Sequence, residues 1–231
     1  MNSQNGYVSS EGVFLPRPGV SAIFLLKHRD KMKYIEEFIN NSILGLYYAP
    51  VPSKIYNITI FDIWKSKEPL TKLQLHRLQE LSKDDSDRYD QLLEQVSKRP
   101  DLAINVLVKD LATADHFLQS KIPMETTVIC NELFYDDSIF LNITWLDPKM
   151  GDYIKTVTSN LSTIFQTSGS VYSIGIMLGY KYKVIDEKHE ELVSYEINRL
   201  GKIINIFDFT MIIEQPRIAS YSKVSNCKIF N

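Results

Sequence analysis

Hydrophobic and polar residues alternate strictly along residues 56–62, Tyr-Asn-Ile-Thr-Ile-Phe-Asp. Because successive side chains on a strand point to opposite faces, this alternation predicts a β-strand. Asn57 and Thr59 are expected to share one face of that strand with Ile55 and Phe61. Two polar side chains on one face of an otherwise apolar strand indicate either an exposed sheet surface or the floor of a cleft.

The segment before this strand predicts a strand followed by a helix. Residues 20–26 are apolar enough for a buried strand, and apolar positions recur at helical spacing over residues 32–43. Asp30 is expected to cap this helix and Gly45 to end it. With the strand described above these elements form a βαβ unit, which follows a flexible leader at residues 1–12.

Helical periodicity returns at about residues 66–98, where leucines recur on both sides of an acidic stretch at residues 82–87. We interpret this segment as a helical insertion whose two helices are joined by the acidic loop. Pro100 is expected to close the insertion. Residues 102–108 are expected to form the next strand.

The second half of the chain again alternates between strands and helices. Its expected elements are a hairpin of strands at 126–133 and 139–145, a helix begun by Asp147-Pro148 and ended by Gly169, a strand at 171–182, a helix between Asp186 and Gly201, and closing strands at 207–214 and 222–230. The two halves therefore repeat each other in order.

This repeat aligns the strand at 22–26 with residues 138–141, and the strand at 56–62 with residues 172–180. Asn142-Ile143-Thr144 copies the polar triplet of the first half. It falls in the strand before the helix, however, and not in the strand that the repeat aligns with the first triplet.

Two βαβ lobes, each with a two-residue polar motif on its last strand, resemble the organisation of the 2H phosphoesterase superfamily. Three segments resemble a LigT-like branch described as a domain of unknown function: Leu15-Pro16-Arg17-Pro18-Gly19, Pro52-Ser53-Lys54-Ile55-Tyr56 and Leu178-Gly179-Tyr180. The resemblance implies an α+β fold with pseudo-symmetric lobes around a central cleft. It also implies that residues 13–231 form a single bilobal domain carrying the helical insertion.

Members of that family carry His-x-Thr or His-x-Ser in each lobe. The resemblance implies that the two histidines act as general base and general acid on a phosphodiester while the hydroxyls hold phosphoryl oxygens. At the matching positions this chain has Asn57-Ile58-Thr59 and Gly175-Ile176-Met177. If Asn142-Ile143-Thr144 is the second motif instead, the site still lacks a base.

Loss of these histidines removes the groups that titrate near neutral pH. An imidazole can present a lone pair or a proton, whereas an amide does not titrate in this range and glycine presents nothing. Losing one proton-transfer group typically costs about 10² to 10⁴ in rate. Asn57, Thr59, Gly175 and Met177 are therefore predicted to mark degenerate catalytic motifs, with no catalytic residue assigned.

The expected ligand-binding residues are Asn57, Thr59, Tyr180 and Tyr182. The amide and the hydroxyl can hydrogen-bond a phosphate, and the two tyrosines follow the second motif closely enough to stack on a base. The alternation of Tyr180-Lys181-Tyr182-Lys183 favours an edge strand protected by lysines over such stacking.

Composition limits the partners. The 26 Lys and Arg nearly balance the 28 Asp and Glu, and a net charge of −2 gives no field for strong nucleic-acid or membrane binding. The expected ligand is a nucleotide or a phosphorylated small molecule held locally. Two distant cysteines and four unpaired histidines indicate neither a metal site nor a cofactor.

The chain carries no apolar run near the roughly 18 residues of a membrane span. We therefore expect a soluble, cytoplasmic protein. Abundant Asn, Ile, Lys and Tyr suggest an AT-rich genome, which is compatible with a pathogen or a virus whose protein acts as an effector in a host cytoplasm.

The leading hypothesis is a 2H-fold pseudoenzyme that binds a ligand or a protein partner without cleaving phosphodiesters. A second hypothesis is a phosphodiesterase or transferase with relocated catalytic groups, using His28, Asp62 or Tyr180. A third is a protein-interaction module that uses the inserted helices as its working surface.

Overall fold

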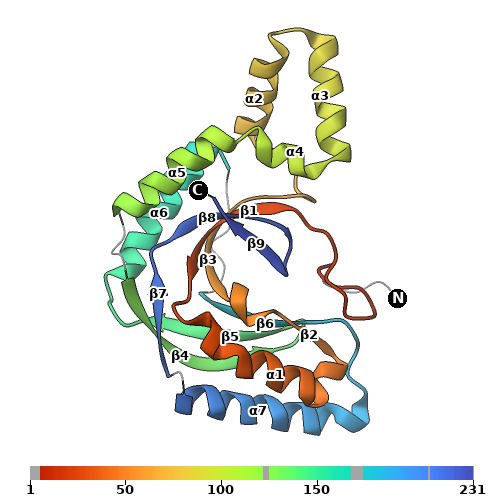
Figure 1. Ribbon diagram of the computed structural model, residues 1–231, viewed down its shortest axis with the longest axis vertical. Helices are drawn as coiled ribbons and strands as arrows, with labels where there is room; N and C mark the ends of the chain where they lie inside the picture. The colour runs from red at the N-terminus through yellow and green to blue at the C-terminus, as the bar shows by residue number, and fades with distance from the viewer. Residues whose placement is uncertain (1–5, 122–124, 168–173, 208, 231) are drawn as a thin grey trace.

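The computed structural model describes residues 6–121, 125–167, 174–207 and 209–230. Within these ranges, nine strands form one curled sheet, ordered β7-β4-β5-β6-β3-β1-β8-β9 with β2 paired to β6 (Figure 1). The strands are β1 (Gly19–Leu25), β2 (Tyr48–Pro50), β3 (Asn57–Lys65), β4 (Glu125–Tyr135), β5 (Ser138–Trp145), β6 (Gly175–Lys181), β7 (Thr210–Glu214), β8 (Arg217–Lys223) and β9 (Asn226–Ile229). The pairings between them are antiparallel.

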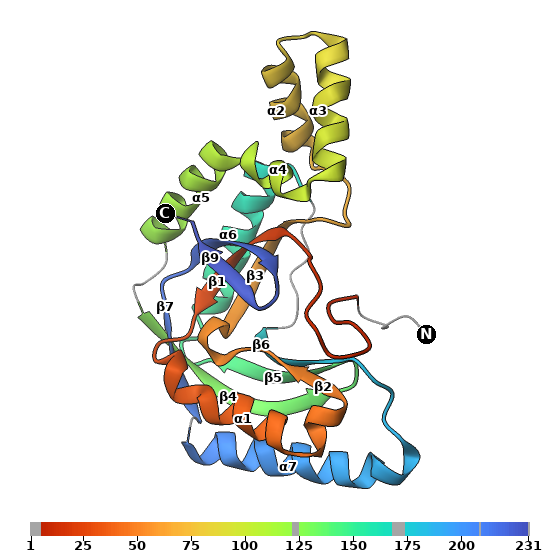
Figure 2. The ribbon, with the colours of Figure 1, turned by 45° about the vertical axis from the view of Figure 1, so that its right-hand side comes forward.

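Two pairs of helices cover the outside of the sheet, and a third group projects from it (Figures 1 and 2). The helices are α1 (Lys33–Asn41), α2 (Lys72–Ser82), α3 (Ser86–Lys98), α4 (Pro100–Asn105), α5 (Val108–Lys121), α6 (Met150–Phe165) and α7 (Glu190–Phe207). Helix α1 packs beside α7, which lies against β4, while α5 packs beside α6 and contacts β8.

The centre of the sheet is the contact between β3 and β6, where Ile58 lies opposite Ile176. On either side the order of strands is matched, with β6-β5-β4 on one side and β3-β1-β8 on the other. Helix α1 follows β1 but contacts β6, and α6 follows β5 but contacts β3. Each lobe therefore contributes its helix to the strands of the other, and the fold is the two-lobed α+β arrangement that the sequence predicted.

The expected strand at residues 102–108 is wrong. Pro100 does not close the helical segment but lies in the first turn of α4, and helices continue through α5 to Lys121. The buried apolar side chains recur every three or four residues: Ala103, Leu107, Leu111, Ala114 and Leu118. This helical spacing is visible only over a window longer than the seven residues that suggested a strand.

The first βαβ unit also differs in detail. β1 and β3 are direct antiparallel neighbours, and a short strand, β2, lies between α1 and β3 in sequence. A 3₁₀ turn at Arg29–Met32 precedes α1, whose N-cap is Met32 with no side-chain hydrogen bond, so Asp30 does not cap the helix. The helix ends at Asn41, before Gly45.

The glycine and aspartate signals in the second half are also corrected. Gly201 lies inside α7, which continues to Phe207. A Cβ on Gly201 would lie 3.7 Å from Leu133 Cδ1, an ordinary van der Waals distance, so this position packs close to β4. Asp186 makes no side-chain cap, and its carboxylate instead accepts a hydrogen bond from the Tyr47 hydroxyl at 3.0 Å. Helix α6 ends at Phe165, and Gly169 lies outside the described residues.

The hairpin expected at residues 126–145 is confirmed by the pairing of β4 with β5. The C-terminal strands are three and not two, because β8 was missed and β8 with β9 forms a further hairpin. The backbone N–H of Ile218 and the Arg217 guanidinium both bond the buried Asp115 carboxylate of α5. This contact fixes β8 beside the helices.

The described part of the expected leader, residues 6–12, folds back toward the sheet. Val8 is buried and pairs with Phe14, and the backbone N–H of Leu15 donates to Tyr7 O at 2.9 Å. The division into a leader and a single domain over residues 13–231 stays a prediction.

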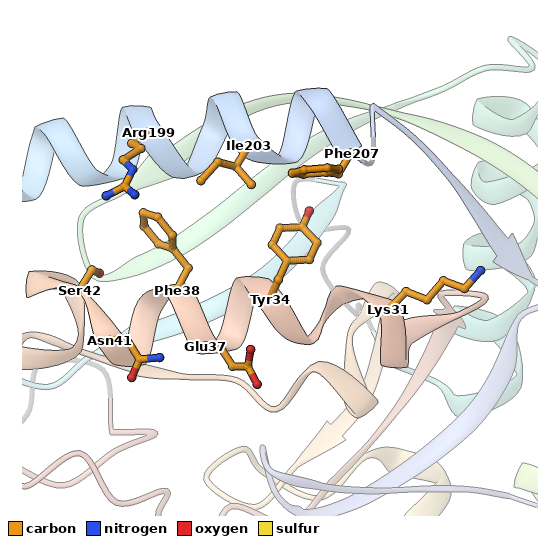
Figure 3. A pocket seen from close by; sticks show the side chains of 9 residues that line it. All are labelled: Lys31, Tyr34, Glu37, Phe38, Asn41, Ser42, Arg199, Ile203 and Phe207. Carbon is orange, nitrogen blue, oxygen red and sulfur yellow. The ribbon is translucent and has the colours of Figure 1, made fainter.

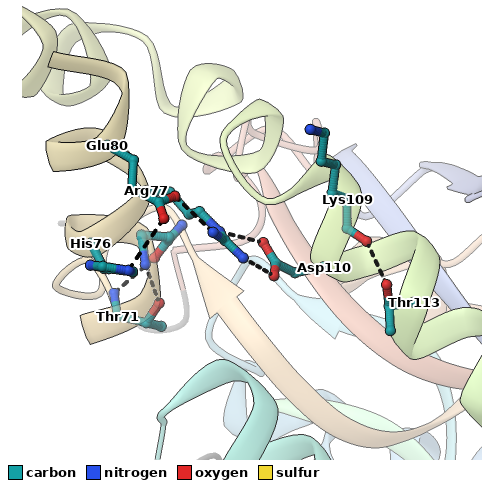
Figure 4. Close-up of polar contacts among 8 residues, drawn as sticks. Thr71, His76, Arg77, Glu80, Lys109, Asp110 and Thr113 are labelled. Carbon is teal, nitrogen blue, oxygen red and sulfur yellow. Dashed lines mark hydrogen bonds and ion pairs between the residues drawn. The ribbon is translucent and has the colours of Figure 1, made fainter. Parts of the chain in front are cut away.

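The helices α2 and α3 form a hairpin that projects from the body (Figures 1 and 2). Its base is held by Arg77, which donates from Nε and from Nη2 to the two oxygens of Asp110 on α5 at 3.0 and 2.7 Å (Figure 4). The buried Gln74 amide donates to Ala103 O at 2.9 Å. The insertion is thus anchored to α4 and α5 by oriented polar contacts. Among the described helices, none is both long and apolar enough to span a membrane.

Candidate functional site

A cleft of about 380 Å³ lies over the central strands. Its floor is formed by β1, β3, β5, β6 and β8, and Tyr7 and Val224 border it from outside the middle of the sheet. Asn57, Thr59, Gly175 and Met177 all line this cleft. The face that the sequence left open is therefore a cleft floor and not an exposed sheet surface.

The pairing of β3 with β6 places the two motif segments side by side in the sheet. Because the strands are antiparallel and Ile58 lies opposite Ile176, Asn57 is opposite Met177 and Thr59 is opposite Gly175. Asn142 and Thr144 do not line the cleft, and Thr144 Oγ1 accepts a hydrogen bond from Asn131 at 2.6 Å. Residues 175–177, and not residues 142–144, therefore lie beside residues 57–59 on the neighbouring central strand.

Two bulges in β3 decide which of its side chains reach the cleft. The β1 residues Gly19, Ser21, Ile23 and Leu25 alternate regularly, and their partners on β3 are Lys65, Asp62, Thr59 and Asn57. The extra residues in β3 shift its alternation twice, as bulges do. Phe61, expected on the cleft face, instead lies opposite Ala22 and is buried in the core. Asp62 and Lys65 take its place on the cleft face.

Asn57 and Thr59 are hydrogen-bonded to their own strand. Asn57 Nδ2 donates to Ile55 O at 2.8 Å, and Thr59 Oγ1 donates to Asn57 Oδ1 at 3.3 Å. Both side chains are half-buried. The longer hydrogen bond is the weaker of the two. A ligand oxygen can therefore replace Asn57 Oδ1 as the acceptor of the Thr59 hydroxyl with little loss of free energy.

The opposite side of the cleft is filled by an aromatic ring. A Cβ placed on Gly175 would lie 2.3 Å from Phe140 Cζ and 2.4 Å from Leu141 O. Real Cβ atoms do not approach other atoms this closely. Phe140 and the β5 backbone therefore stand where any side chain at position 175 would begin.

A buried ion pair lies at the far end of the cleft. Asp62 Oδ2 is 2.5 Å from Lys65 Nζ, and Asp62 Oδ1 accepts from Ser21 Oγ at 2.6 Å. Ser21 Oγ also lies 3.4 Å from the Tyr221 hydroxyl. Burial acts to lower the pKa of Lys65, but the Asp62 carboxylate outweighs it and the pKa is raised. Burial raises the pKa of Tyr221 as well.

Tyr180 and Tyr182 lie in different surroundings. Tyr180 lines the cleft, its ring is 4.8 Å from that of Tyr7, and burial raises its pKa. Tyr182 is not among the lining residues; its hydroxyl donates to Gly45 O at 2.7 Å. The edge-strand interpretation of this segment is wrong, because β6 lies between β5 and its partners β2 and β3.

The histidines lie elsewhere. His28 adopts a left-handed backbone conformation before α1 and does not line the cleft. His76 pairs with Glu80 on α2, His116 is exposed, and His189 Nδ1 contacts the Tyr47 hydroxyl at 2.6 Å. Within the described ranges, no three His, Cys, Asp or Glu side chains gather in a way that could hold a metal ion.

A second cavity, of about 710 Å³, lies between α1 and α7 (Figure 3). Tyr34, Phe38, Arg199 and Phe207 line it, and the Arg199 guanidinium lies 5.3 Å from the centre of the Phe38 ring. None of the motif residues reaches this groove. The motif residues therefore belong to the cleft over β3 and β6 and not to the groove between α1 and α7.

Sequence reasoning missed Ser21, Lys65, Phe140 and Tyr221 in the cleft. A signal for Lys65 existed, because polar residues at 57, 59, 62 and 65 interrupt an apolar strand at spacings that change from two to three. Such a change is what a bulge produces. No local signal identifies Phe140, whose position depends on the pairing of β5 with β6.

No protein-family model matches the chain. Its sequence is 22% identical over 208 residues to uncharacterized protein 127L of Invertebrate iridescent virus 6, covering 86% of this chain and 83% of that protein. A conserved Agrobacterium tumefaciens protein of unknown function, ATU0111, superposes with a TM-score of 0.66 at 12% identity, covering 98% of this chain and 91% of that one.

The structure of E. coli LigT in complex with 3′-AMP superposes with a TM-score of 0.50 at 6% identity, covering 92% of this chain and 94% of LigT. The chain has the LigT-like fold of the 2H phosphoesterases.

Proposed function

We propose that this protein binds a nucleotide or another phosphate-bearing ligand through Asn57 and Thr59 and does not cleave phosphodiesters. The observation that carries the proposal is at Gly175, where Phe140 Cζ and Leu141 O occupy the place of a Cβ. The second lobe therefore has no room for a proton-transfer group at the position that faces Thr59.

The remaining motif residues support binding but not proton transfer. Thr59 and Asn57 offer a hydroxyl and an amide, which hydrogen-bond phosphoryl oxygens without titrating near neutral pH. Met177, opposite Asn57, offers only a weak acceptor. In E. coli LigT the same fold is seen in complex with 3′-AMP, which makes a nucleoside monophosphate a suitable first ligand.

The proposal is tested by measuring binding and turnover on the same protein. We expect 3′-AMP to bind in isothermal titration calorimetry, and the Asn57→Ala/Thr59→Val variant to bind at least about tenfold more weakly, because two hydrogen bonds are lost. Thr144→Val is the matched control, since Thr144 is exposed and outside the cleft. It should bind as the unaltered protein does.

Turnover is followed with 2′,3′-cyclic nucleotides. We expect no hydrolysis above a buffer blank. Hydrolysis that Asn57→Ala abolishes would contradict the pseudoenzyme proposal, and unchanged 3′-AMP affinity in the double variant would contradict the binding role of Asn57 and Thr59.

A relocated active site is the second candidate, because Asp62 and Tyr180 both line the cleft. His28 does not, and the recorded hydrogen bonds of Asp62 go to Ser21 and Lys65, not to Thr59. This candidate requires turnover that Asp62→Asn or Tyr180→Phe removes while ligand binding remains.

A protein-interaction role of the insertion is the third candidate. It is favoured by the projecting hairpin of α2 and α3, on which Leu81 is 49% exposed (Figure 2). Leu81→Glu would remove binding of such a partner and leave 3′-AMP binding unchanged. The viral relative is compatible with a protein that acts as an effector inside an infected cell.

A further inference from the structure

The cleft contains a polar group that the proposed phosphate site does not use. Asp62 and Lys65 form an ion pair whose side chains are only 9% and 11% exposed, and both line the cleft. Ser21 donates to one oxygen of Asp62, and the Tyr221 hydroxyl lies beside Ser21. This cluster, the Asp62–Lys65 subsite, lies opposite Ser21 of β1. Thr59 and Asn57 pair with β1 residues two and four positions away from Ser21, so they lie about 7 Å and about 13 Å from the subsite along the sheet at about 3.4 Å per residue.

A purely structural role explains this subsite poorly. Removing two charges from water is costly, and apolar residues of similar size often serve stability as well or better. β3 nevertheless contains two irregularities in its register, and they turn Asp62 and Lys65 to the same side as Asn57 and Thr59. Bulges that re-aim side chains in this way are frequent next to functional sites.

The chemistry of the subsite selects an uncharged group. The carboxylate and the ammonium cancel in charge, so the pair gives no net attraction for a second phosphate. A carboxylate offers about four acceptor positions, and Asp62 uses one on each oxygen for Ser21 and Lys65. It therefore keeps one acceptor position on each oxygen for a ligand that presents two adjacent donors.

We propose that the Asp62–Lys65 subsite binds the edge of a guanine base, with two neighbouring N–H donors on Asp62 and the adjacent carbonyl oxygen toward Lys65. Guanine presents the 2-amino group, N1–H and O6 in this order along one edge. Hypoxanthine lacks the 2-amino group, and adenine lacks both the N1–H and the carbonyl.

The aromatic surroundings and the spacing agree with a nucleotide. Tyr7, Tyr180 and Tyr221 line the same cleft, and aromatic side chains commonly stack on bases. The Asn57–Thr59 pair lies about 7 to 13 Å from Asp62 along the sheet, a span that includes the distance from the phosphate to the base edge of a mononucleotide. The inference rests on the proposed phosphate site, since Asn57 and Thr59 would hold the other end of the ligand.

The test compares GMP, IMP and AMP by isothermal titration calorimetry on the unaltered protein. We expect GMP to bind at least about tenfold more tightly than IMP or AMP, because one matched hydrogen-bonded pair to a base typically discriminates by this factor or more. In Asp62→Asn, where one acceptor oxygen becomes a donor, the ratio of GMP to IMP affinity should fall to about one. Thr144→Val should keep the ratio.

Each outcome separates the two proposals. Equal affinities for GMP, IMP and AMP, all weakened by Asn57→Ala/Thr59→Val, would overturn the guanine subsite and keep the phosphate site. No binding of any nucleotide would overturn both. If Asp62→Asn fails to fold, the ligand series on the unaltered protein still decides, and Ser21→Ala supplies a milder change, which should reduce the preference for GMP.

Discussion

The two central strands of the cleft present opposite chemistry to the same space. β3 carries Asn57, Thr59, Asp62 and Lys65, all on the cleft side because of its bulges. β6 carries Gly175 and Met177 at the matching positions and borders the Phe140 ring. The strands are arranged symmetrically about the centre of the sheet, whereas the side chains at their matching positions differ in chemistry.

This difference separates recognition from acid–base chemistry. A two-histidine mechanism needs a group from each strand, one to take and one to give a proton. Hydrogen bonding of a ligand can be supplied by one strand alone, and β3 keeps its polar groups despite the desolvation that burial costs. Our proposal rests on this difference: β3 presents hydrogen-bonding side chains to the cleft, and β6 presents a glycine and a methionine beside them.

The largest expected effect comes from breaking the ion pair on the β3 side. Asp62→Ala leaves the Lys65 ammonium buried without its 2.5 Å partner, and removing one member of a buried pair typically costs about 3–5 kcal/mol. Urea unfolding at neutral pH measures the loss. The double variant Asp62→Leu/Lys65→Met removes both charges and should recover most of the stability. If it does not, the ion pair serves to stabilise β3 and not to bind a ligand.

A smaller effect is expected on the β6 side. Gly175→Ala places a Cβ 2.3 Å from Phe140 Cζ and 2.4 Å from Leu141 O, and overpacking of this kind costs about 1–3 kcal/mol. Gly151→Ala is the control, because no atom lies within 4 Å of its Cβ and it sits in α6. Alanine there should stabilise the helix by about 0.5–1 kcal/mol. Equal melting temperatures for the two variants would show that the β6 side has spare room.

The fold was predictable where local pattern and resemblance agreed. The alternation around Asn57 and the hairpin expected at residues 126–145 correspond to observed strands, and the order of elements indicated the two lobes. The helices that the prediction missed, α4 and α5, have a pattern that is visible only in a long window. Their helical spacing of buried residues appears only when the sequence from Ala103 to Leu118 is considered as a whole. Gly201 resembles a helix stop but lies within α7, where it packs close to Leu133 of β4.

The cleft was predictable only in part. The strand pattern indicated that Asn57 and Thr59 share a face, and both line the cleft. The same pattern placed Phe61 on that face, because a strict period of two does not allow for bulges. Phe140 comes from a strand 83 positions farther along the sequence than Asn57, and only the pairing of β5 with β6 brings it against Gly175.

The smallest expected effect compares a tyrosine from each side of the cleft, Tyr180 on β6 and Tyr221 on β8. Burial raises both pKa values above the ordinary 10.0, so the folded state holds these protons more tightly than the unfolded state does. Their contribution to stability is complete below pH 10 and declines as the pH rises beyond it. At pH 11 each tyrosine should cost about 1 kcal/mol relative to pH 8. Tyr180→Phe and Tyr221→Phe should each reduce that loss in urea unfolding at the two pH values. A reduction in one variant alone would mean that water reaches the tyrosine on the other side, and the two sides would then differ in burial as well as in chemistry.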